Sequence, residues 1–366
     1  MVDNLLDHAA ELGWPDLNEA INSQLATLED IVRHVNEITS LSKVNQDRMI
    51  KNLSMKHALM PENEEPGTFP NRILPCRQNP KFYGREDELE KIHDYLRPKG
   101  DQSLRTYTIY GRRGVGKTEI ALQFAYVNRA GFDAIFWIQC ETSVAIRQSF
   151  TNAAVSLNLP GADRAGHHEE NLLAVQNWLK RTRKKWLLIF DNAERDQVLK
   201  AYWPIGASGA ILITTRKYFN YSKDLQRKGG TILPFNLQES WDLLLQLLGD
   251  DWKKDDREGR IPQTEVVAAK NMLAELAGLA LAIQQAAILI QDSTMGGPTI
   301  SKTFEMFKER IRTLPPRYRS ERSTSETALD ALWDMSFKAL SPKARTLLGV
   351  LGWLSPGKTQ SILPSR

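Results

Sequence analysis

The stretch GRRGVGKT, from Gly111 to Thr118, is the feature that most restricts how this 366-residue chain can fold. It matches the pattern G-x-x-x-x-G-K-[ST] in full. An apolar segment, TYTIY (106–110), comes directly before it, and a helical pattern, TEIALQFAYV (118–127), follows it. A strand, a glycine-rich turn and a helix in this order form a phosphate-binding loop, because backbone N–H groups and the positive end of the helix dipole meet at the turn. The sequence therefore predicts a nucleotide site at this loop.

The residues of this loop have separate expected roles. Its three glycines let the backbone turn toward phosphate oxygens. Lys117 is expected to reach the β- and γ-phosphates as a point charge, and the Thr118 hydroxyl is expected to bind Mg²⁺. The residues of the loop and the following helix that we expect to contact the nucleotide are Gly111, Gly114, Val115, Gly116, Lys117, Thr118 and Glu119.

The segment WLLIFDNAE (186–194) supplies the expected partner of the loop. Asp191 ends an apolar run, and in a parallel sheet its carboxylate would lie at the carboxyl edge, where ligands bind. There it would hold Mg²⁺ directly or through water, together with Thr118. We expect Lys117 and Asp191 to be the residues that carry any catalysis.

The residues that follow Asp191 bear on whether a nucleotide is hydrolysed. Asn192 cannot accept a proton, so it cannot be the general base for an attacking water, although it can orient one. Glu194 is a candidate substitute base, and the alternative interpretation is a solvated turn residue. In GAILITTR (209–216), Thr215 or Arg216 could contact the γ-phosphate, and the alternative is a strand end with polar caps.

The pattern along the chain predicts an α/β fold, a doubly wound parallel sheet followed by a helical domain. Short apolar runs rich in β-branched and aromatic residues alternate with amphipathic helices, as in buried parallel strands. The strand candidates are TYTIY (106–110), AIFWI (134–138), WLLIF (186–190), AILIT (210–214) and TILPF (231–235). The expected domains are a helical N-terminal segment (1–60), a Pro-rich linker (61–80), the nucleotide-binding domain (81–236), a helical domain (237–325) and a last part (326–366).

The N-terminal segment carries an apolar stripe at helical spacing, which would pack on its own domain or on a partner helix. The residues of the stripe are Ile21, Leu25, Leu28, Val32, Val35 and Ile38. The net charge of +4, from 48 basic and 44 acidic residues, gives little support for nucleic-acid binding. Two cysteines cannot form a disulfide framework. Without a signal peptide or an apolar run of about 18 residues, we expect a cytoplasmic protein without a membrane span.

Five motifs in order and spacing resemble the NB-ARC module of the STAND class of P-loop NTPases, and the flanking sequences look most like its fungal NLR-like branch. The resemblance covers about residues 78–356. It implies that the segment from Phe82 to Arg85 packs around the adenine and ribose, and that a helical domain closes over the nucleotide through Gly278 to Leu281. The nucleotide contacts expected in these segments are Tyr83, Gly84, Arg85, Leu279 and Ala280. The matching segments are FYGREDEL (82–89), GRRGVGKT (111–118), LLIFDN (187–192), ILITTR (211–216) and LAGLALAI (276–283).

The chain departs from that family at three positions. Ala280 stands where the family usually has proline, Asn192 where it has a second aspartate, and Arg113 where it tends to have a small residue. The last part, 326–366, resembles the beginning of an incomplete winged-helix domain, as in a truncated product or a short relative.

The resemblance implies a signalling switch that holds ADP or ATP with Mg²⁺, hydrolyses slowly or not at all, and self-associates when activated. Apart from the resemblance, the apolar stripe of the N-terminal helical segment offers a surface on which a partner could bind. The alternatives are a turnover ATPase of the AAA type and a nucleotide-stabilised scaffold that does not switch.

Overall fold

The computed structural model describes residues 68–98, 103–164, 167–194, 196–204, 208–217, 227–291, 299–313 and 324–345. The chain divides into two compact units, Met1–Glu65 and Pro66–Arg366, and all described residues belong to the second. The predicted N-terminal helical segment and its apolar stripe lie outside the described residues, as do residues 346–366.

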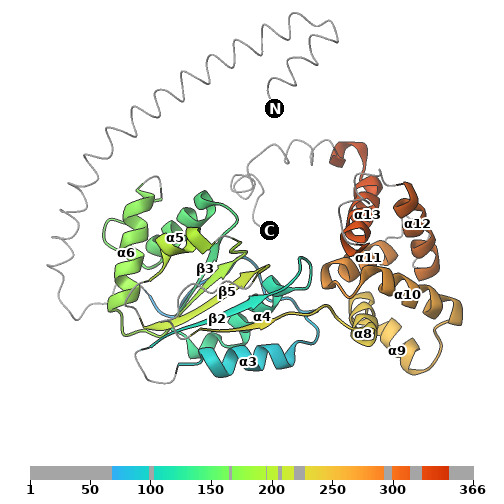
Figure 1. Ribbon diagram of the computed structural model, residues 1–366, viewed down its shortest axis with the longest axis horizontal. Helices are drawn as coiled ribbons and strands as arrows, with labels where there is room; N and C mark the ends of the chain where they lie inside the picture. The colour runs from blue at the N-terminus through green and yellow to red at the C-terminus, as the bar shows by residue number, and fades with distance from the viewer. Residues whose placement is uncertain are drawn as a thin grey trace, which may run out of the picture. The chain divides into compact units, whose positions relative to one another are not determined.

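Six parallel strands form one sheet, in the order β1-β3-β4-β5-β2-β6 (Figure 1). The helices α3 (Glu86–Leu96), α4 (Lys117–Val127), α5 (Ser143–Ser156), α6 (His168–Arg181) and α7 (Asp196–Tyr202) lie between the strands in the chain. This arrangement confirms the predicted α/β class with a doubly wound parallel sheet. The strands are β1 (Asn71–Ile73), β2 (Leu104–Tyr110), β3 (Ala134–Gln139), β4 (Trp186–Asp191), β5 (Gly209–Thr215) and β6 (Arg227–Thr231).

The central strands are apolar on both faces because each face is covered by helices. In β3, Ile135 and Trp137 belong to a core shared with α3 and α4, whereas Phe136 and Ile138 belong to a core shared with α5 and α6. Successive side chains of a strand point to opposite faces, so a continuous apolar run is what a sheet covered on both sides requires.

The position predicted for the last strand, 231–235, is wrong. β6 covers RKGGT (227–231) and pairs in parallel with β2 alone, so it is an edge strand, where polar residues and glycines are tolerated. After Thr231 the chain leaves the sheet. The Ile232 N–H still donates to the Tyr110 carbonyl, at 2.6 Å, but the Phe235 N–H donates to Gly278 of the helical part, at 2.9 Å.

The stretch that was interpreted as a linker contains β1, which pairs with β3 from Asn71 to Ile73. The Asn71 side chain is buried, donates to the Ser156 carbonyl and accepts from the Ser156 hydroxyl, each at 2.9 Å. Part of the proline-rich stretch is thereby fixed to the sheet and to α5.

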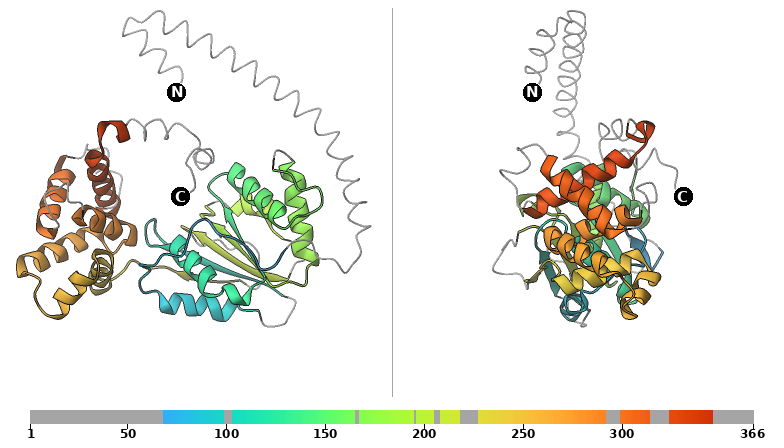
Figure 2. Two further views of the ribbon diagram at one scale, coloured as in Figure 1. Left: turned by 180° about the vertical axis from the view of Figure 1, so that it is seen from behind. Right: turned by 90° about the vertical axis from the view of Figure 1, so that its right-hand side faces the viewer.

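After the sheet, the described chain forms helices joined by loops. Asn236 begins α8 (Leu237–Leu248) with a capping box, in which Asn236 and Glu239 bond reciprocally. The helices α9 (Asp250–Arg257), α10 (Gln263–Leu276), α11 (Ala280–Gln291), α12 (Ile300–Thr313) and α13 (Thr324–Ala339) follow (Figure 2). The buried side chains of α13, among them Leu332 and Met335, share one core with α10, α11 and α12. The predicted boundary at 325/326 therefore falls inside a helix of this bundle.

Candidate nucleotide-binding site

The loop between β2 and α4 has the backbone of a phosphate cradle. Gly114 and Gly116 have φ values of 84° and 98°, which only glycine adopts without strain, and α4 begins at Lys117 directly after Gly116. A Cβ atom on Gly111 would lie 2.5 Å from the Ile232 carbonyl oxygen. Glycine at this position therefore lets the segment after β6 pass directly against the loop.

Lys117 is placed at the inner side of this loop. Its Nζ donates to the Gly111 carbonyl at 2.8 Å and to the Arg112 carbonyl at 3.0 Å. Burial lowers the pKa of the Lys117 ammonium, and the nearby charge of Glu194 opposes this effect. A partly desolvated cation beside backbone N–H groups suits a phosphate ligand.

Three hydroxyl and carboxylate groups from three elements converge beside the loop. The Thr118 Oγ1 donates to Asp191 Oδ1 at 2.9 Å, and the Thr214 Oγ1 donates to the same oxygen at 2.6 Å. Mg²⁺ binds oxygens at 2.0–2.1 Å in an octahedron, so two ligands at neighbouring corners lie about 2.9 Å apart. Thr118 and Asp191 therefore fit the two protein ligands expected of a magnesium ion.

The strand order explains how these groups meet. β5 lies between β4, which ends at Asp191, and β2, which leads into the loop. Thr214 at the end of β5 therefore bridges the two, and it also accepts the Asn192 backbone N–H at 2.8 Å. Within the described part of the chain no three His, Cys, Asp or Glu side chains form a metal cluster. A metal held here would need phosphate or water oxygens to complete its shell, as Mg²⁺ usually does.

The pKa of Asp191 is raised by burial, and the hydrogen bonds from Thr214 and Thr118 act in the opposite direction. The negative charge of Glu141 raises it further, and the charge of Lys117 lowers it. Because metal binding needs the ionised carboxylate, the two threonines favour the state of Asp191 that can bind Mg²⁺.

Asn192 and Glu194 differ in how they are held. Asn192 has a left-handed backbone, with φ of 61°, and its side chain lines the cavity. Glu194 Oε1 forms an ion pair with Arg216 Nε at 3.2 Å. Glu194, the candidate substitute base, is therefore paired with Arg216, the residue expected to contact the γ-phosphate.

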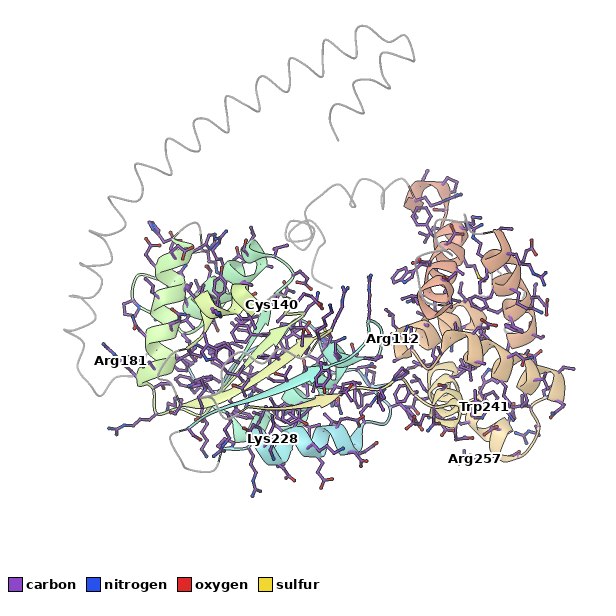
Figure 3. All side chains as sticks on the ribbon, viewed as in Figure 1. Arg112, Cys140, Arg181, Lys228, Trp241 and Arg257 are labelled. Atoms are coloured by element: carbon purple, nitrogen blue, oxygen red, sulfur yellow. The ribbon has the colours of Figure 1, made fainter. Side chains whose placement is uncertain are left out.

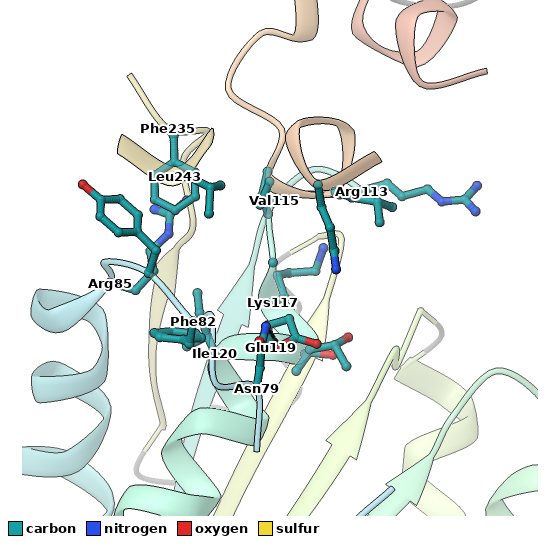
Figure 4. Close-up of a pocket in the computed structure, with 18 of the residues that line it drawn as sticks. Asn79, Phe82, Arg85, Arg113, Val115, Lys117, Glu119, Ile120, Phe235 and Leu243 are labelled. Atoms are coloured by element: carbon teal, nitrogen blue, oxygen red, sulfur yellow. Dashed lines mark hydrogen bonds between the residues drawn. The ribbon is translucent and has the colours of Figure 1, made fainter. Parts of the chain in front are cut away.

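The other end of the cavity is aromatic. The Arg85 guanidinium lies 4.0 Å from the centre of the Phe235 ring, and its Nη2 donates to the Leu233 carbonyl at 2.8 Å. The Tyr83 hydroxyl donates to Asp242 Oδ2 at 3.1 Å, and burial is the largest cause that raises the pKa of Tyr83 to about 12. In Figure 4, Arg85 and Phe235 lie together on one side of the cavity, away from Lys117.

These groups surround one cavity of about 550 Å³, within the usual range for small-molecule sites. The loop contacts the start of α11, where the Leu281 N–H donates to the Gly114 carbonyl at 3.0 Å. The sequence-predicted site residues that line the cavity are Tyr83, Arg85, Gly114, Val115, Gly116, Lys117, Thr118, Glu119, Asp191, Arg216 and Ala280.

Three predicted residues do not line the cavity. Gly111 packs on the segment after β6, and a Cβ on Gly84 would lie 3.6 Å from the Phe235 ring. Leu279 is buried in the core next to the loop, where a Cβ on Gly114 would lie 3.9 Å from the Leu279 side chain. All three lie outside the lining of the cavity, next to the residues that form it.

The sequence interpretation missed several residues of the cavity wall. Of the two hydroxyls that end β5, Thr214 lines the cavity, whereas Thr215 is fully buried and is not part of the lining. Glu141 lies two residues after β3, and Asn192 directly follows β4, so the segment after one more strand was the available signal. Leu281, at the end of the segment expected to close over the nucleotide, also lines the cavity, and the lining residues without an expected role are Asn79, Lys81, Ile120, Glu141, Thr214, Phe235, Leu243, Leu247 and Gln284.

Replacement of Thr214 by valine should shift the pH dependence of the site. The variant removes a hydrogen bond that lowers the pKa of Asp191, so this pKa rises and Asp191 is ionised only at higher pH. A hydrogen bond to a charged group contributes about 1.5–3 kcal/mol, so the acid limit of Mg²⁺-dependent nucleotide binding should rise by about one pH unit. Binding of a fluorescent nucleotide measured against pH, with and without Mg²⁺, checks this.

Thr215→Val is the matched control. Thr215 is the next residue, is equally buried, and its hydroxyl has no hydrogen-bond partner in the described structure. Its pH profile should be unchanged, and an equal shift in both variants would contradict the assigned role of Thr214.

Comparisons with known proteins agree with this geometry. Residues 81–201 match the family model of the AAA ATPase domain. A nucleotide-binding leucine-rich repeat (NLR)-like protein from Hyaloscypha variabilis is 27% identical over 278 residues, which cover 68% of this chain and 26% of that protein. This chain thus corresponds to about a quarter of the length of that relative.

Solved structures that match parts of this chain include Cdc6p from Pyrobaculum aerophilum, with a TM-score of 0.44 at 15% identity, covering 76% of this chain and 88% of that one. Another is a signal transduction ATPase with numerous domains (STAND) from Pyrococcus horikoshii that has a tetratricopeptide repeat sensor. Its TM-score is 0.38 at 15% identity, and the match covers 70% of this chain and 40% of that one.

The loop geometry and the match of residues 81–201 to the family model support a nucleotide-binding P-loop NTPase domain, in which Thr118 and Asp191 fit a divalent metal. None of the helices in the described ranges combines the length and apolar character that a membrane crossing requires.

Proposed function

We propose that the protein is an adenine-nucleotide switch of the NB-ARC type in the STAND class, which holds ADP or ATP with Mg²⁺ and hydrolyses slowly or not at all. The observation that carries this proposal is the pair Asn192 and Glu194. The residue after the metal carboxylate is an amide, and the carboxylate two residues later forms an ion pair with Arg216. Neither is placed as a free base for an attacking water.

The contact between the loop and α11 supports switching. The Leu281 N–H bonds to Gly114, and Ala280 and Leu281 line the same cavity as Lys117. A nucleotide in the cavity would therefore contact the sheet domain and the helical bundle at once. A ligand shifts a conformational equilibrium only by its different affinity for the two states, and such a shared cavity allows that difference.

The NLR-like relative and the five ordered motifs favour a role in recognition or defence signalling, with self-association of the activated form in the cytoplasm. Within the nucleotide, the phosphates would lie at Lys117 and the base toward Tyr83, Arg85 and Phe235. Bound Mg²⁺ would neutralise phosphate charge, while Lys117 and Arg216 would hold the terminal phosphates.

One observation favours a turnover ATPase as the second candidate. Glu141, two residues beyond the end of β3, lines the cavity, and its charge raises the pKa of Asp191. The Glu141 side chain is exposed. A carboxylate at this place could orient or deprotonate a water without Asn192 or Glu194.

Two measurements on the purified full chain separate the candidates. Denaturation should release about one ADP per chain, and ATP turnover should stay far below the roughly 1 per second at the low end of ordinary enzymes. Asn192→Asp should raise turnover by about 10-fold or more, because it supplies the missing base. Turnover near 1 per second that is lost in Glu141→Gln would instead establish the second candidate.

A further inference from the structure

A second cavity, of about 440 Å³, lies at the amino ends of the strands, opposite the end that carries the nucleotide site. Figure 3 shows Arg181, which lines it, at the far end of the sheet from Arg112 of the phosphate loop. Its wall comes from the ends of α3 and α6 and the starts of β2, β4 and β5. The lining residues without a charge are Leu96, Pro98, Ser103, Phe132, Thr182, Trp186, Ser208, Gly209 and Ala210.

The remaining wall of this cavity is entirely cationic. Among the 15 described lining residues, six are Lys or Arg and none is Asp or Glu. The six basic residues are Arg105, Lys180, Arg181, Arg183, Lys184 and Lys185. This local excess exceeds the net charge of +4 of the whole chain.

Stabilisation of the α6 dipole explains only part of this cluster. Lys180 and Arg181 lie in the last turn of α6, where cations stabilise the helix dipole. Arg183, Lys184 and Lys185 lie beyond the helix, and Arg105 comes from β2. The Arg105 side chain is buried and fixed by its Nη1, which donates to the Arg97 carbonyl at 2.9 Å.

Within the described residues, no carboxylate is paired with the lysine side chains of this cluster or with the Arg181 side chain. Asp133 accepts the backbone N–H of Lys185, at 2.8 Å, and not its ammonium. In the described ranges the side chains of Lys180, Arg181 and Lys185 form no ion pair, and the Lys184 ammonium lies 5.0 Å from the centre of the Phe69 ring. These four like charges, which have no acidic partner in the described part of the chain, repel one another, and an anion would relieve this repulsion.

The floor of the cavity is rigid. Trp186 is fully buried and its ring N–H donates to the Leu179 carbonyl at 3.2 Å. A Cβ atom on Gly209 would lie 2.3 Å from the Trp186 ring, so the ring packs directly on the backbone of β5. The hollow is therefore formed by the fold before any ligand enters.

We propose that this basic cavity binds a small ligand that carries several clustered phosphates, either as a free polyphosphate or as a phosphorylated lipid headgroup. One phosphate would balance only a fraction of the charge of Lys180, Arg181, Lys184 and Lys185, whereas several would match it. The volume suits a small molecule. A nucleic-acid strand would instead require cations spread along a groove that follows its backbone.

The test uses the full chain saturated with ADP, so that the phosphate loop is occupied. Inositol hexakisphosphate serves as the free probe, and vesicles that contain phosphatidylinositol bisphosphate serve as the headgroup probe. Binding should be saturable with one site, and Lys180→Glu/Lys185→Glu should weaken it by at least about 10-fold at 0.15 M salt. Both lysines are exposed, so the melting temperature should change little.

The control is Lys91→Glu/Lys270→Glu, which makes the same change in net charge at exposed positions of α3 and α10. Its affinity should fall much less, because neither lysine lines the cavity and exposed charges outside it are screened by salt. Binding to the vesicles alone would assign the lipid headgroup as the source. No saturable binding, an equal loss in the control, or tighter binding of a 20-base-pair RNA duplex than of either probe would overturn the proposal.

Discussion

The Lys117→Ala variant of the full chain should bind ADP and ATP at least about 100-fold more weakly than the unchanged chain, a loss of about 2.7 kcal/mol. Lys117 is the cation at the centre of the phosphate cradle, between the glycine-rich backbone and the Thr118–Asp191 pair. A charged hydrogen bond contributes about 1.5–3 kcal/mol, and a partly buried ammonium that contacts two phosphates contributes more than one such bond. Isothermal titration measures the change.

Loss of binding must be separated from loss of folding. In the variant the Gly111 and Arg112 carbonyls lose the Lys117 ammonium as a partner, but water can replace it, because neither residue is buried. The melting temperature without nucleotide should therefore change little. Saturating ADP, at about 100 times its dissociation constant, should stabilise the unchanged chain by about 2.7 kcal/mol and the variant hardly at all.

Lys91→Ala is the matched control for this prediction. Lys91 is an exposed lysine of α3 that does not line the cavity, so its removal should leave the affinity for ADP within about twofold, since exposed charges are screened. A Lys117 variant that binds ADP as tightly as the Lys91 variant would show that the loop does not hold the phosphates.

The sequence predicted the central strands well because buried parallel strands leave continuous apolar runs, and β3, β4 and β5 have them. It failed at β6, where Gly229 and Gly230 lie on the edge of the sheet. A Cβ on Gly230 would lie 2.9 Å from the Tyr107 hydroxyl, so the tyrosine of β2 takes the place of a side chain there. β6 pairs through its backbone at the edge of the sheet, so its sequence lacks the apolar run by which the central strands were predicted.

Within the site, residues next to the loop in sequence were predictable, and residues brought in by the tertiary fold were not. Asp191 could be placed because an acid that ends an apolar strand lies at the ligand edge. Thr214 and Thr215 are neighbours and equally buried, but only Thr214 lines the cavity. Their sequence does not show which of the two side chains points to the site. Phe235 reaches the cavity through contacts with Arg85 and Gly278, which lie far from it in the chain.

Gly278→Ala should destabilise the protein by at least about 3 kcal/mol, because it combines backbone strain with a steric overlap that nearby atoms cannot relieve. Gly278 has φ of +69°, and a Cβ atom there would lie 1.9 Å from the Phe235 carbonyl oxygen and 2.8 Å from its nitrogen. Both are backbone atoms. The hydrogen bond from the Phe235 N–H to the Gly278 carbonyl would have to break, and Phe235 would move away from Arg85.

The Gly259→Ala variant measures the cost of backbone strain without a steric overlap. Gly259 has nearly the same φ, +64°, but a Cβ there would meet nothing within 4 Å, so the expected cost is only the left-handed backbone penalty of about 1–2 kcal/mol. Denaturant titration and limited proteolysis of both variants measure the difference. Because Phe235 lines the nucleotide cavity, Gly278→Ala should also weaken ADP binding, whereas Gly259→Ala should not. Equal stability of the two variants would mean that the contact between Phe235 and Gly278 does not tie the helical bundle to the sheet domain, and nucleotide coupling would then depend on the contact between Gly114 and Leu281.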